Sequence, residues 1–280
     1  MASKKKFKNL SAIQIANFNR DGYVIVHNFL NDAEIIKLHN IAIADQTMKK
    51  NAFDLNDLTG KSTKLTLWYT PKDDAYGLLS KSEKMINNID KLLEGDAPVC
   101  HFHSKLMQKE PKVGGAWEWH QDYGYWYKNE FLFPNQLMSV MVAITDANKE
   151  NGCLQVIKGS HKMGRVEHGF SGEQVGASQH YVDLALRTMD LVHVELKAGD
   201  ALFFHSNILH RSDANLSDYP RWSLISCYNR ASNVPYNEAN MSCIKPIKAV
   251  ANEALLNLDT DNIETITSDF LIKAEDRALK

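Results

Sequence analysis

Hydrophobic and capping residues in the first 95 positions are spaced as in helices. Ser11 is followed three residues later by Gln14, and Asn31 is followed by Glu34 at the same spacing. A Ser or Asn with Glu or Gln three residues on is the signature of a capping box at a helix start. The apolar residues behind each box predict a short helix that ends at Gly22 and a second helix towards residue 44.

The remainder of this N-terminal region has a weaker pattern. Residues 23–26 are rich in β-favouring side chains and predict a strand, whereas residues 75–93 predict a helical stretch. Residues 47–64 are polar and show neither period, which favours a loop. The part of the chain from about residue 8 to 95 is therefore expected to be mainly helical.

From residue 99 the pattern changes to short β-favouring runs separated by turn residues such as those at 111–115 and 198–200. Many short strands punctuated in this way are typical of an all-β sandwich or barrel. Residues 163–190 are polar and contain glycine, which favours a long loop over a site. The predicted strands cover residues 99–108, 117–123, 137–144, 152–157, 192–196, 201–204 and 222–228.

These segments predict one mainly β domain over residues 1–280 with helices on its outside. No internal repeat and no low-complexity linker divides the sequence. We expect a helical N-terminal part at about 8–95, a β core at about 99–230 and a partly helical C-terminal extension at about 231–280. A chain of this length buries enough apolar surface for such a core.

Composition narrows the class of partner. The chain has 32 Lys and Arg against 34 Asp and Glu, a net charge of −2, which argues against a nucleic acid or an anionic membrane held by bulk charge. No run approaches the roughly 18 apolar residues of a membrane span, and no signal peptide is expected. The four cysteines lie far apart and predict reduced thiols in a cytoplasmic protein. A small molecule is the expected partner, and the oligomeric state is left open.

The sequence WEWHQDYGYWY contains the candidate metal ligands His120 and Asp122. On a strand, side chains two residues apart point to one face, so the imidazole and the carboxylate would converge. Such a pair also occurs by chance or as ordinary hydrogen-bonded partners. His210, distant in the sequence, offers a second imidazole if it lies on another strand that faces the same point. Two histidines and one carboxylate form the site that non-haem Fe(II) oxygenases use.

At these residues the chain resembles the phytanoyl-CoA dioxygenase family of Fe(II)- and 2-oxoglutarate-dependent oxygenases, over roughly residues 11–230. The resemblance implies a double-stranded β-helix (a jelly-roll, cupin-like core) with iron between its two sheets. It maps the iron ligands onto His120, Asp122 and His210, and the 2-oxoglutarate anchor onto Arg221, assisted by Ser212. Its landmarks are 21–23, 29–30, 120–122, 151–154, 159–161, 199–201, His210 and Arg221.

The chemistry of the co-substrate supports Arg221 independently of the resemblance. 2-Oxoglutarate binds iron at one end and extends its second carboxylate into the core. A planar, permanently charged guanidinium is suited to hold that carboxylate through two parallel hydrogen bonds. A hairpin over residues 213–220 would bring His210 and Arg221 side by side. The remaining reading for Arg221 is a surface residue, and for Ser212 a polar residue in a turn.

The aromatic stretch is most similar to ectoine hydroxylase-like members of the family. That similarity places Trp126 and Tyr123 at the substrate, Lys105 at the substrate, and His103 at the 2-oxoglutarate. Residues 103 and 105 alternate with period two, so one strand face presents both. The alternatives are strand packing for the aromatic residues, a buried hydrogen-bonded role for His103 and a solvated position for Lys105.

The leading hypothesis is a dioxygenase that uses Fe(II), 2-oxoglutarate and O2 to hydroxylate a small polar metabolite, releasing succinate and CO2. The metabolite is expected to be amino-acid-like, ectoine-like or an aminophosphonate. The carboxylate at Asp122 predicts hydroxylation, since related halogenases have a small residue there. Two alternatives remain: an acyl-CoA hydroxylase, for which the motifs lack a nearby basic cluster, and a non-catalytic metal-binding jelly roll.

Overall fold

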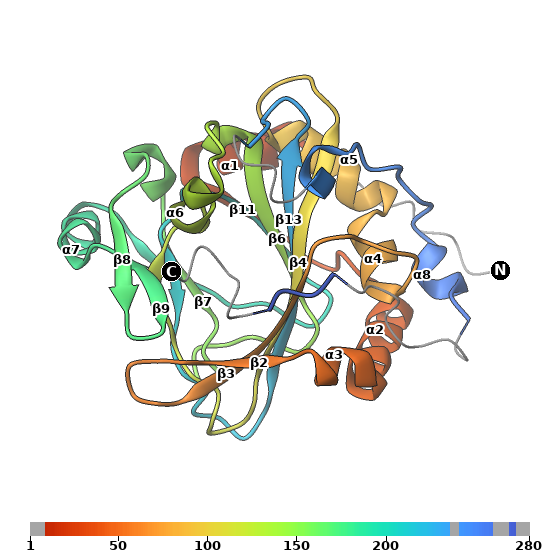
Figure 1. The fold of residues 1–280 in the computed structure, drawn as a ribbon, viewed down its shortest axis with the longest axis horizontal. Helices are drawn as coiled ribbons and strands as arrows, with labels where there is room; N and C mark the ends of the chain where they lie inside the picture. Colours follow the sequence, from red (N-terminus) through yellow and green to blue (C-terminus); the bar gives the residue numbers. More distant parts are fainter. Residues whose placement is uncertain (1–8, 236–240, 260–268, 273–280) are drawn as a thin grey trace.

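The computed structural model describes residues 9–235, 241–259 and 269–272, and two antiparallel sheets form its centre (Figure 1). The larger sheet has seven strands in the order β1-β11-β6-β13-β4-β3-β2, and the smaller has four in the order β10-β7-β12-β5. Strands β8 and β9 form a separate hairpin. The bounds are β1 Tyr23–Val26, β2 Phe53–Asn56, β3 Ser62–Trp68, β4 Val99–Lys109, β5 Trp117–His120, β6 Leu137–Ala143, β7 Leu154–Ile157, β8 His168–Ser171, β9 Gln174–Ala177, β10 Leu191–Val194, β11 Ala201–His205, β12 His210–Ser212 and β13 Arg221–Arg230.

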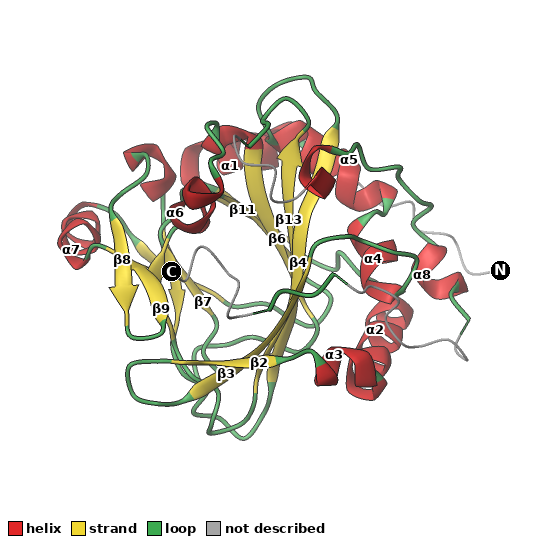
Figure 2. Ribbon diagram, viewed as in Figure 1, coloured by secondary structure: helices red, strands yellow, loops and turns green. Residues whose placement is uncertain are grey.

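Helices flank these sheets on opposite sides of the molecule (Figure 2). Helices α2, α4, α5 and α8 lie on one side, and α7 lies beside the β8–β9 hairpin on the other (Figure 1). The expected mainly β fold with flanking helices is confirmed. The bounds are α1 Ala12–Asp21, α2 Asp32–Ala44, α3 Gln46–Lys50, α4 Ala75–Ser80, α5 Glu83–Leu92, α6 Asp122–Trp126, α7 Gln179–Thr188 and α8 Ala254–Asn257, with 3-10 turns η1 Tyr127–Asn129, η2 Pro134–Gln136, η3 Ser160–Met163 and η4 Met241–Ile244.

Both predicted capping boxes are confirmed. The Ser11 side chain accepts a hydrogen bond from the Gln14 backbone, the Asn31 side chain accepts one from Glu34, and each partner's side chain binds back. The first helix ends at Gly22, whose φ of 84° lies in the left-handed region that glycine adopts without a Cβ penalty. Local chemistry therefore determines where these helices begin and where the first one ends.

Two expected loops are wrong. The polar stretch 47–64 forms most of α3 and β2 and the start of β3, and the stretch 163–190 contains the β8–β9 hairpin and α7. Strand β3 is ordered by pairing with β4, where Leu65 lies opposite Met107. Such pairing over more than forty residues is a tertiary effect that local periodicity does not report. The predicted helix over 75–93 is confirmed but is divided into α4 and α5.

Strand β6 shows why the centre of the large sheet is buried on both faces. Met138, Val140 and Val142 belong to the apolar core shared with the helices. Leu137 and Met141, at the alternate positions, belong to the core between the two sheets. Because successive side chains point to opposite faces, an almost uninterrupted apolar strand fills both cores. The polar residue Ser139 lies on the inner face of this strand.

The C-terminal extension packs back on the large sheet. It contains η4 and α8, as expected for a partly helical segment, and the backbone N–H of Leu271 donates to the carbonyl of Leu67 at 2.8 Å. Residues 236–240, 260–268 and 273–280 of the extension lie outside the described residues. All four cysteines are buried, and none of them forms a disulfide. Among the helices that the structure describes, none has the length and apolarity to cross a bilayer.

Because His101 on β4 is buried, we expect the free energy of unfolding to fall in acid. Its ring is buried against the Tyr69 carbonyl (3.0 Å) and the Ser104 hydroxyl (2.8 Å), and burial lowers its pKa from 6.5 to about 4. The unfolded chain therefore takes up this proton first as the pH falls. The stabilisation is complete above pH 6.5 and is lost as the pH falls towards 4, by up to about 1.4 kcal/mol per pH unit.

Urea unfolding of the metal-free protein at about pH 7 and pH 5 measures this effect. His101→Asn is expected to reduce the difference in unfolding free energy between the two pH values by about 1–2 kcal/mol. A pH dependence identical to that of the unsubstituted protein would mean that His101 does not titrate in this interval.

Candidate active site

Three buried side chains between the sheets converge as candidate metal ligands. His120 is the last residue of β5, Asp122 is the first residue of α6, and His210 is the first residue of β12. His120 and His210 lie directly opposite each other in the strand register. The Nε2 atom of each imidazole is 3.9 Å from Oδ1 of Asp122, and the three ligand atoms all lie within 4.8 Å of one another. The predicted triad is thus brought together.

The route by which Asp122 reaches this point differs from the prediction of a continuous strand. The chain leaves β5 after His120 and turns at Gln121 into α6. The buried Gln121 amide fixes this turn, because its Nε2 donates to the carbonyls of Gly164 and Asn207, each at 2.7 Å. Imidazole and carboxylate therefore converge through a strand-to-helix turn and not through alternation along one strand.

Glycine at position 124 allows a second support of the turn. The His168 ring lies against Gly124, and a Cβ atom there would be only 2.2 Å from its Nε2. That Nε2 accepts a hydrogen bond of 3.0 Å from the Gln121 backbone N–H. The segment 163–190 was expected to be a loop over the site. Instead it packs on the outer side of the turn that carries Asp122 and stabilises it.

Both imidazoles are oriented and neutral. His120 Nδ1 is 2.7 Å from the carbonyl of Glu118, and His210 Nδ1 is 3.0 Å from the carbonyl of Ile208. A carbonyl only accepts, so each Nδ1 carries the proton and each Nε2 lone pair is left for a metal. Burial lowers the pKa of both rings below 6.5. Neutral imidazole is the form that ligates metal ions.

The Asp122 carboxylate is held in its charged form. Burial acts to raise its pKa, but the positive charge of Lys105 and a hydrogen bond from Ser139 act against it, and the pKa lies below the ordinary value. Lys105 Nζ lies 3.9 Å from Oδ1, and the Ser139 hydroxyl donates to Oδ2 at 2.6 Å. The site therefore offers two neutral nitrogens and one anionic oxygen, a set that suits Fe(II).

Arg221 lies in the same interior as a buried cation. It begins β13, is 3% exposed, and its Nε has no hydrogen-bond partner among the described residues. Its Nη2 contacts only the soft Sδ of Met141, at 3.6 Å, among the hydrogen bonds that the structure describes. Burial lowers its pKa to about 10, so it remains charged at neutral pH. A buried guanidinium in this state is suited to receive a carboxylate.

Lys109 is a second buried basic side chain here, and it was not among the predicted site residues. It pairs with Arg221 in the β4–β13 register, and its Nζ donates to Ser212 Oγ at 2.8 Å and to the Asp213 carbonyl at 2.6 Å. Burial, reinforced by the nearby Arg221 charge, lowers its pKa well below 10.5. Lys109 continues the period-two series of 103 and 105, and that signal was available in the sequence.

The segment between His210 and Arg221 was expected to be a hairpin within one sheet, but it connects the two sheets. Strand β12 belongs to the smaller sheet and β13 to the larger, although the connection between them does cover residues 213–220. The metal triad and the Arg221–Lys109 pair therefore come from facing walls of the sandwich. Ser212, predicted to assist 2-oxoglutarate, is tied to the cationic pair through Lys109.

His103 and Trp126 form an aromatic wall near the metal triad. Their ring centroids are 5.8 Å apart, and both pack on Phe102. A bulge at Phe102, where Cys227 pairs with His103, shifts the alternation of β4. Lys105 lies on the same strand with its side chain 14% exposed, so it is more accessible than Arg221.

Tyr123 is used for packing. Its hydroxyl donates to the Phe131 carbonyl at 2.8 Å, and its ring stacks edge-on with Tyr127. Tyr125, which the sequence analysis did not select, lies edge-on to His120 with centroids 5.6 Å apart. The α6 turn places the Tyr125 ring beside His120, and the sequence carries no signal for this placement.

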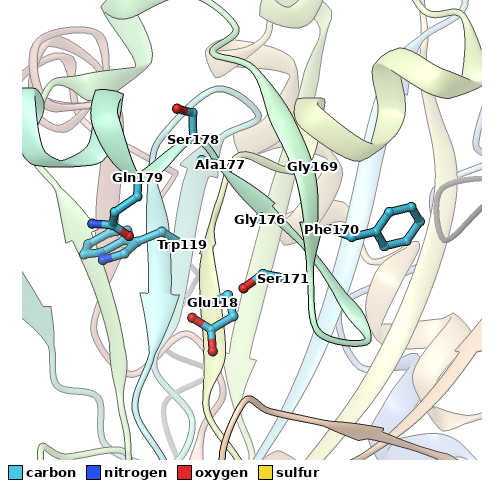
Figure 3. A pocket seen from close by; sticks show the side chains of 9 residues that line it. All are labelled: Glu118, Trp119, Gly169, Phe170, Ser171, Gly176, Ala177, Ser178 and Gln179. Atoms are coloured by element: carbon cyan, nitrogen blue, oxygen red, sulfur yellow. The ribbon is translucent and has the colours of Figure 1, made fainter.

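A separate hollow of about 280 Å³ lies on the outer side of β5 (Figure 3). Trp119, Phe170 and Gln179 are among its lining residues. Trp119 belongs to the outer apolar core under α7, whereas its neighbour His120 faces the interior. The strand thus separates this hollow from the metal triad, and it takes no part in the site.

Comparisons with known proteins place this arrangement among oxygenases. The chain is 28% identical over 235 residues to L-proline trans-4-hydroxylase of Streptomyces griseoviridis, covering 78% of this chain and 86% of that protein. It is 24% identical over 254 residues to ectoine dioxygenase of Halomonas elongata, covering 86% and 74%. The crystal structure of EctD from S. alaskensis in its apoform has the same fold, with a TM-score of 0.67, 21% identity and coverage of 88% and 87%.

A family profile described as phytanoyl-CoA dioxygenase (PhyH) matches residues 18–223. The match begins in α1 and ends in β13, so it includes the metal triad, Lys109 and Arg221. It also covers well over half of the 280 residues. The chain therefore belongs to the phytanoyl-CoA dioxygenase family.

Proposed function

We propose that this protein is an Fe(II)- and 2-oxoglutarate-dependent dioxygenase that hydroxylates a small polar metabolite with release of succinate and CO2. One observation carries the proposal: a buried two-histidine, one-carboxylate triad faces a buried Arg221 whose Nε has no partner among the described residues. A site that only binds a metal has no need for an unpaired guanidinium. A dicarboxylate co-substrate needs both parts of this site, the metal triad for one end and the guanidinium for its far carboxylate.

The residues present fit iron and 2-oxoglutarate. His120, Asp122 and His210 would hold the metal, and Arg221 with Lys109 would hold the far carboxylate of the co-substrate. When bound, Fe(II) and 2-oxoglutarate supply the activation of O2 for C–H hydroxylation. The protein holds the ligand nitrogens deprotonated, and the apolar residues between the sheets exclude water from the reaction.

Lys105 and Trp126 support a small metabolite with an anionic group as the substrate. In the described site, Asp122 is the carboxylate beside Lys105, at 3.9 Å, and a bound metal would take up its charge. The ammonium group would then require another anion, such as a carboxylate or a phosphonate. His103 and Trp126 would form an apolar wall for the carbon skeleton. An amino acid, an ectoine-like zwitterion or an aminophosphonate meets these requirements.

Succinate formation tests the proposal. Protein reconstituted anaerobically with Fe(II) is mixed with 2-oxoglutarate and O2, with or without single metabolites that include L-proline, ectoine and an aminophosphonate. We expect slow succinate release without a metabolite and faster release with a substrate. Complete absence of succinate under every condition would favour a non-catalytic metal-binding jelly roll. Stimulation by acyl-CoA alone would favour an acyl-CoA hydroxylase.

A further inference from the structure

Behind the metal-facing side of Asp122, two buried side chains form a short chain of hydrogen bonds. The hydroxyl of Ser139, on β6, lies 2.6 Å from Oδ2 of Asp122. The same hydroxyl lies 3.3 Å from Sγ of Cys227, on the neighbouring strand β13, with which β6 pairs at this position. Ser139 and Cys227 are both 0% exposed. Both contacts are therefore shielded from bulk water.

The direction of these hydrogen bonds follows from the proton inventory. The ionised carboxylate of Asp122 only accepts, so the single proton of the Ser139 hydroxyl is donated to it. The hydroxyl has no second proton, and its contact with Cys227 therefore uses the thiol as donor. Burial raises the pKa of this thiol to about 12, which keeps its proton in place at neutral pH.

The two oxygens of Asp122 consequently have different surroundings. Oδ1 faces both imidazoles, with each Nε2 at 3.9 Å, whereas Oδ2 carries the 2.6 Å hydrogen bond. Lys105 approaches Oδ1 at 3.9 Å, which exceeds hydrogen-bond distance. The structure thus orients one oxygen towards the metal position and engages the other with Ser139.

The sequence around Ser139 agrees with a specific role. It stands in the strand LMSVMVA, whose other members are apolar. A hydroxyl in such a buried strand carries a desolvation cost unless it is hydrogen-bonded. Alternation along β6 puts position 139 on the inner face with Leu137 and Met141, so the hydroxyl is directed at the carboxylate.

We propose that Ser139, held by Cys227, is a positioning residue that keeps Asp122 a one-oxygen metal ligand. The inference rests on the function proposed above. Fe(II) in this site would have six positions: three for the protein, two for 2-oxoglutarate and one for O2. A carboxylate that bound through both oxygens would occupy one of the three open positions. Engaging Oδ2 keeps that position open.

Anaerobic titration with Fe(II), without turnover, tests the role of Ser139. Ser139→Ala is expected to raise the Kd for Fe(II) about 10- to 100-fold, the usual effect of losing a hydrogen bond to a metal ligand. It is also expected to change the visible charge-transfer band of the Fe(II)–2-oxoglutarate complex, because the carboxylate changes its binding mode. Cys227→Ala should shift both readouts in the same direction but less, and Cys227→Ser, which retains a donor, should restore them.

Ser226→Ala is the matched control. Ser226, like Ser139, carries a buried hydroxyl, but it lies on β13. Its hydroxyl contacts those of Ser80 at 2.8 Å and Ser104 at 2.9 Å on the helix-facing side of the sheet. Its loss should lower stability without changing the Kd or the band. If Ser139→Ala behaves like Ser226→Ala in both readouts, Ser139 is structural and the inference is overturned. If the unsubstituted protein forms no Fe(II)–2-oxoglutarate complex, the proposed function fails instead.

Discussion

Replacing His210 with Ala is expected to abolish succinate formation while the protein remains folded. His210 supplies one of the three ligand atoms that lie within 4.8 Å of one another, and no neighbouring His, Cys, Asp or Glu completes such a group elsewhere in the described chain. Loss of a hydrogen bond to a ligand costs about 10- to 100-fold in metal affinity, so loss of the ligand itself should cost on the order of a thousandfold or more. Fe(II) titration and succinate assays measure the two effects.

The fold should tolerate this change because the described hydrogen bond of the His210 ring is local, to the carbonyl of Ile208. His193→Ala is a suitable control, since His193 lies on β10 of the same small sheet and pairs with Gln155. It should retain iron binding. Turnover by His210→Ala at the level of the unsubstituted protein would remove His210 from the metal centre.

Arg221→Ala is expected to raise the requirement for 2-oxoglutarate far more than it weakens iron binding. Removing one partner of a buried, hydrogen-bonded charge pair costs about 2–5 kcal/mol. At about 1.4 kcal/mol per factor of ten, the KM for 2-oxoglutarate should rise about 30-fold to several thousandfold. Arg211→Ala provides the control, because Arg211 is also cationic but stacks on Trp119, which packs in the outer core under α7.

The buried guanidinium of Arg221 should lower the stability of the protein when no co-substrate is bound. Arg221 is buried, and its Nε has no partner among the described residues, so an apolar residue of similar volume removes a desolvation cost. Arg221→Met is therefore expected to leave the Tm of the metal-free protein unchanged or higher, although 2-oxoglutarate binding is lost. A large fall in Tm together with an unchanged KM for 2-oxoglutarate would show that Arg221 stabilises the fold and that the anchor lies elsewhere.

Much of the fold follows from local signals along the chain. The capping boxes at Ser11 and Asn31 define helix starts, and the β-favouring runs after residue 99 mark most strands of the two sheets. The missed elements include β2, β3, β12, the β8–β9 hairpin and the helices α3 and α7, most of which are short and partly polar. Strand β3 is ordered by pairing with β4, and β12 by pairing with β5 and β7, and the periodicity of one short segment does not contain that information.

In the candidate site, too, some residues could be predicted from the sequence and others could not. His120, Asp122, His210 and Arg221 are identified by residue type together with the family resemblance, and their chemistry is unusual in an interior. Lys109 has a weaker signal. Ser139 and Gln121 have none, because a serine in an apolar strand or a glutamine in a turn has many possible partners, and only the folded chain shows which one it contacts.

The amino-acid sequence alone determined the types of chemical group available: two imidazoles, a carboxylate and a guanidinium, set among short strands. Only the tertiary structure decided their geometry, because β12 and β13 belong to different sheets and the turn at Gln121 directs Asp122 between them. The physical reason is that ligand convergence depends on strand register and sheet packing. These are set by pairings across many tens of residues, whereas residue type and spacing report only local preferences.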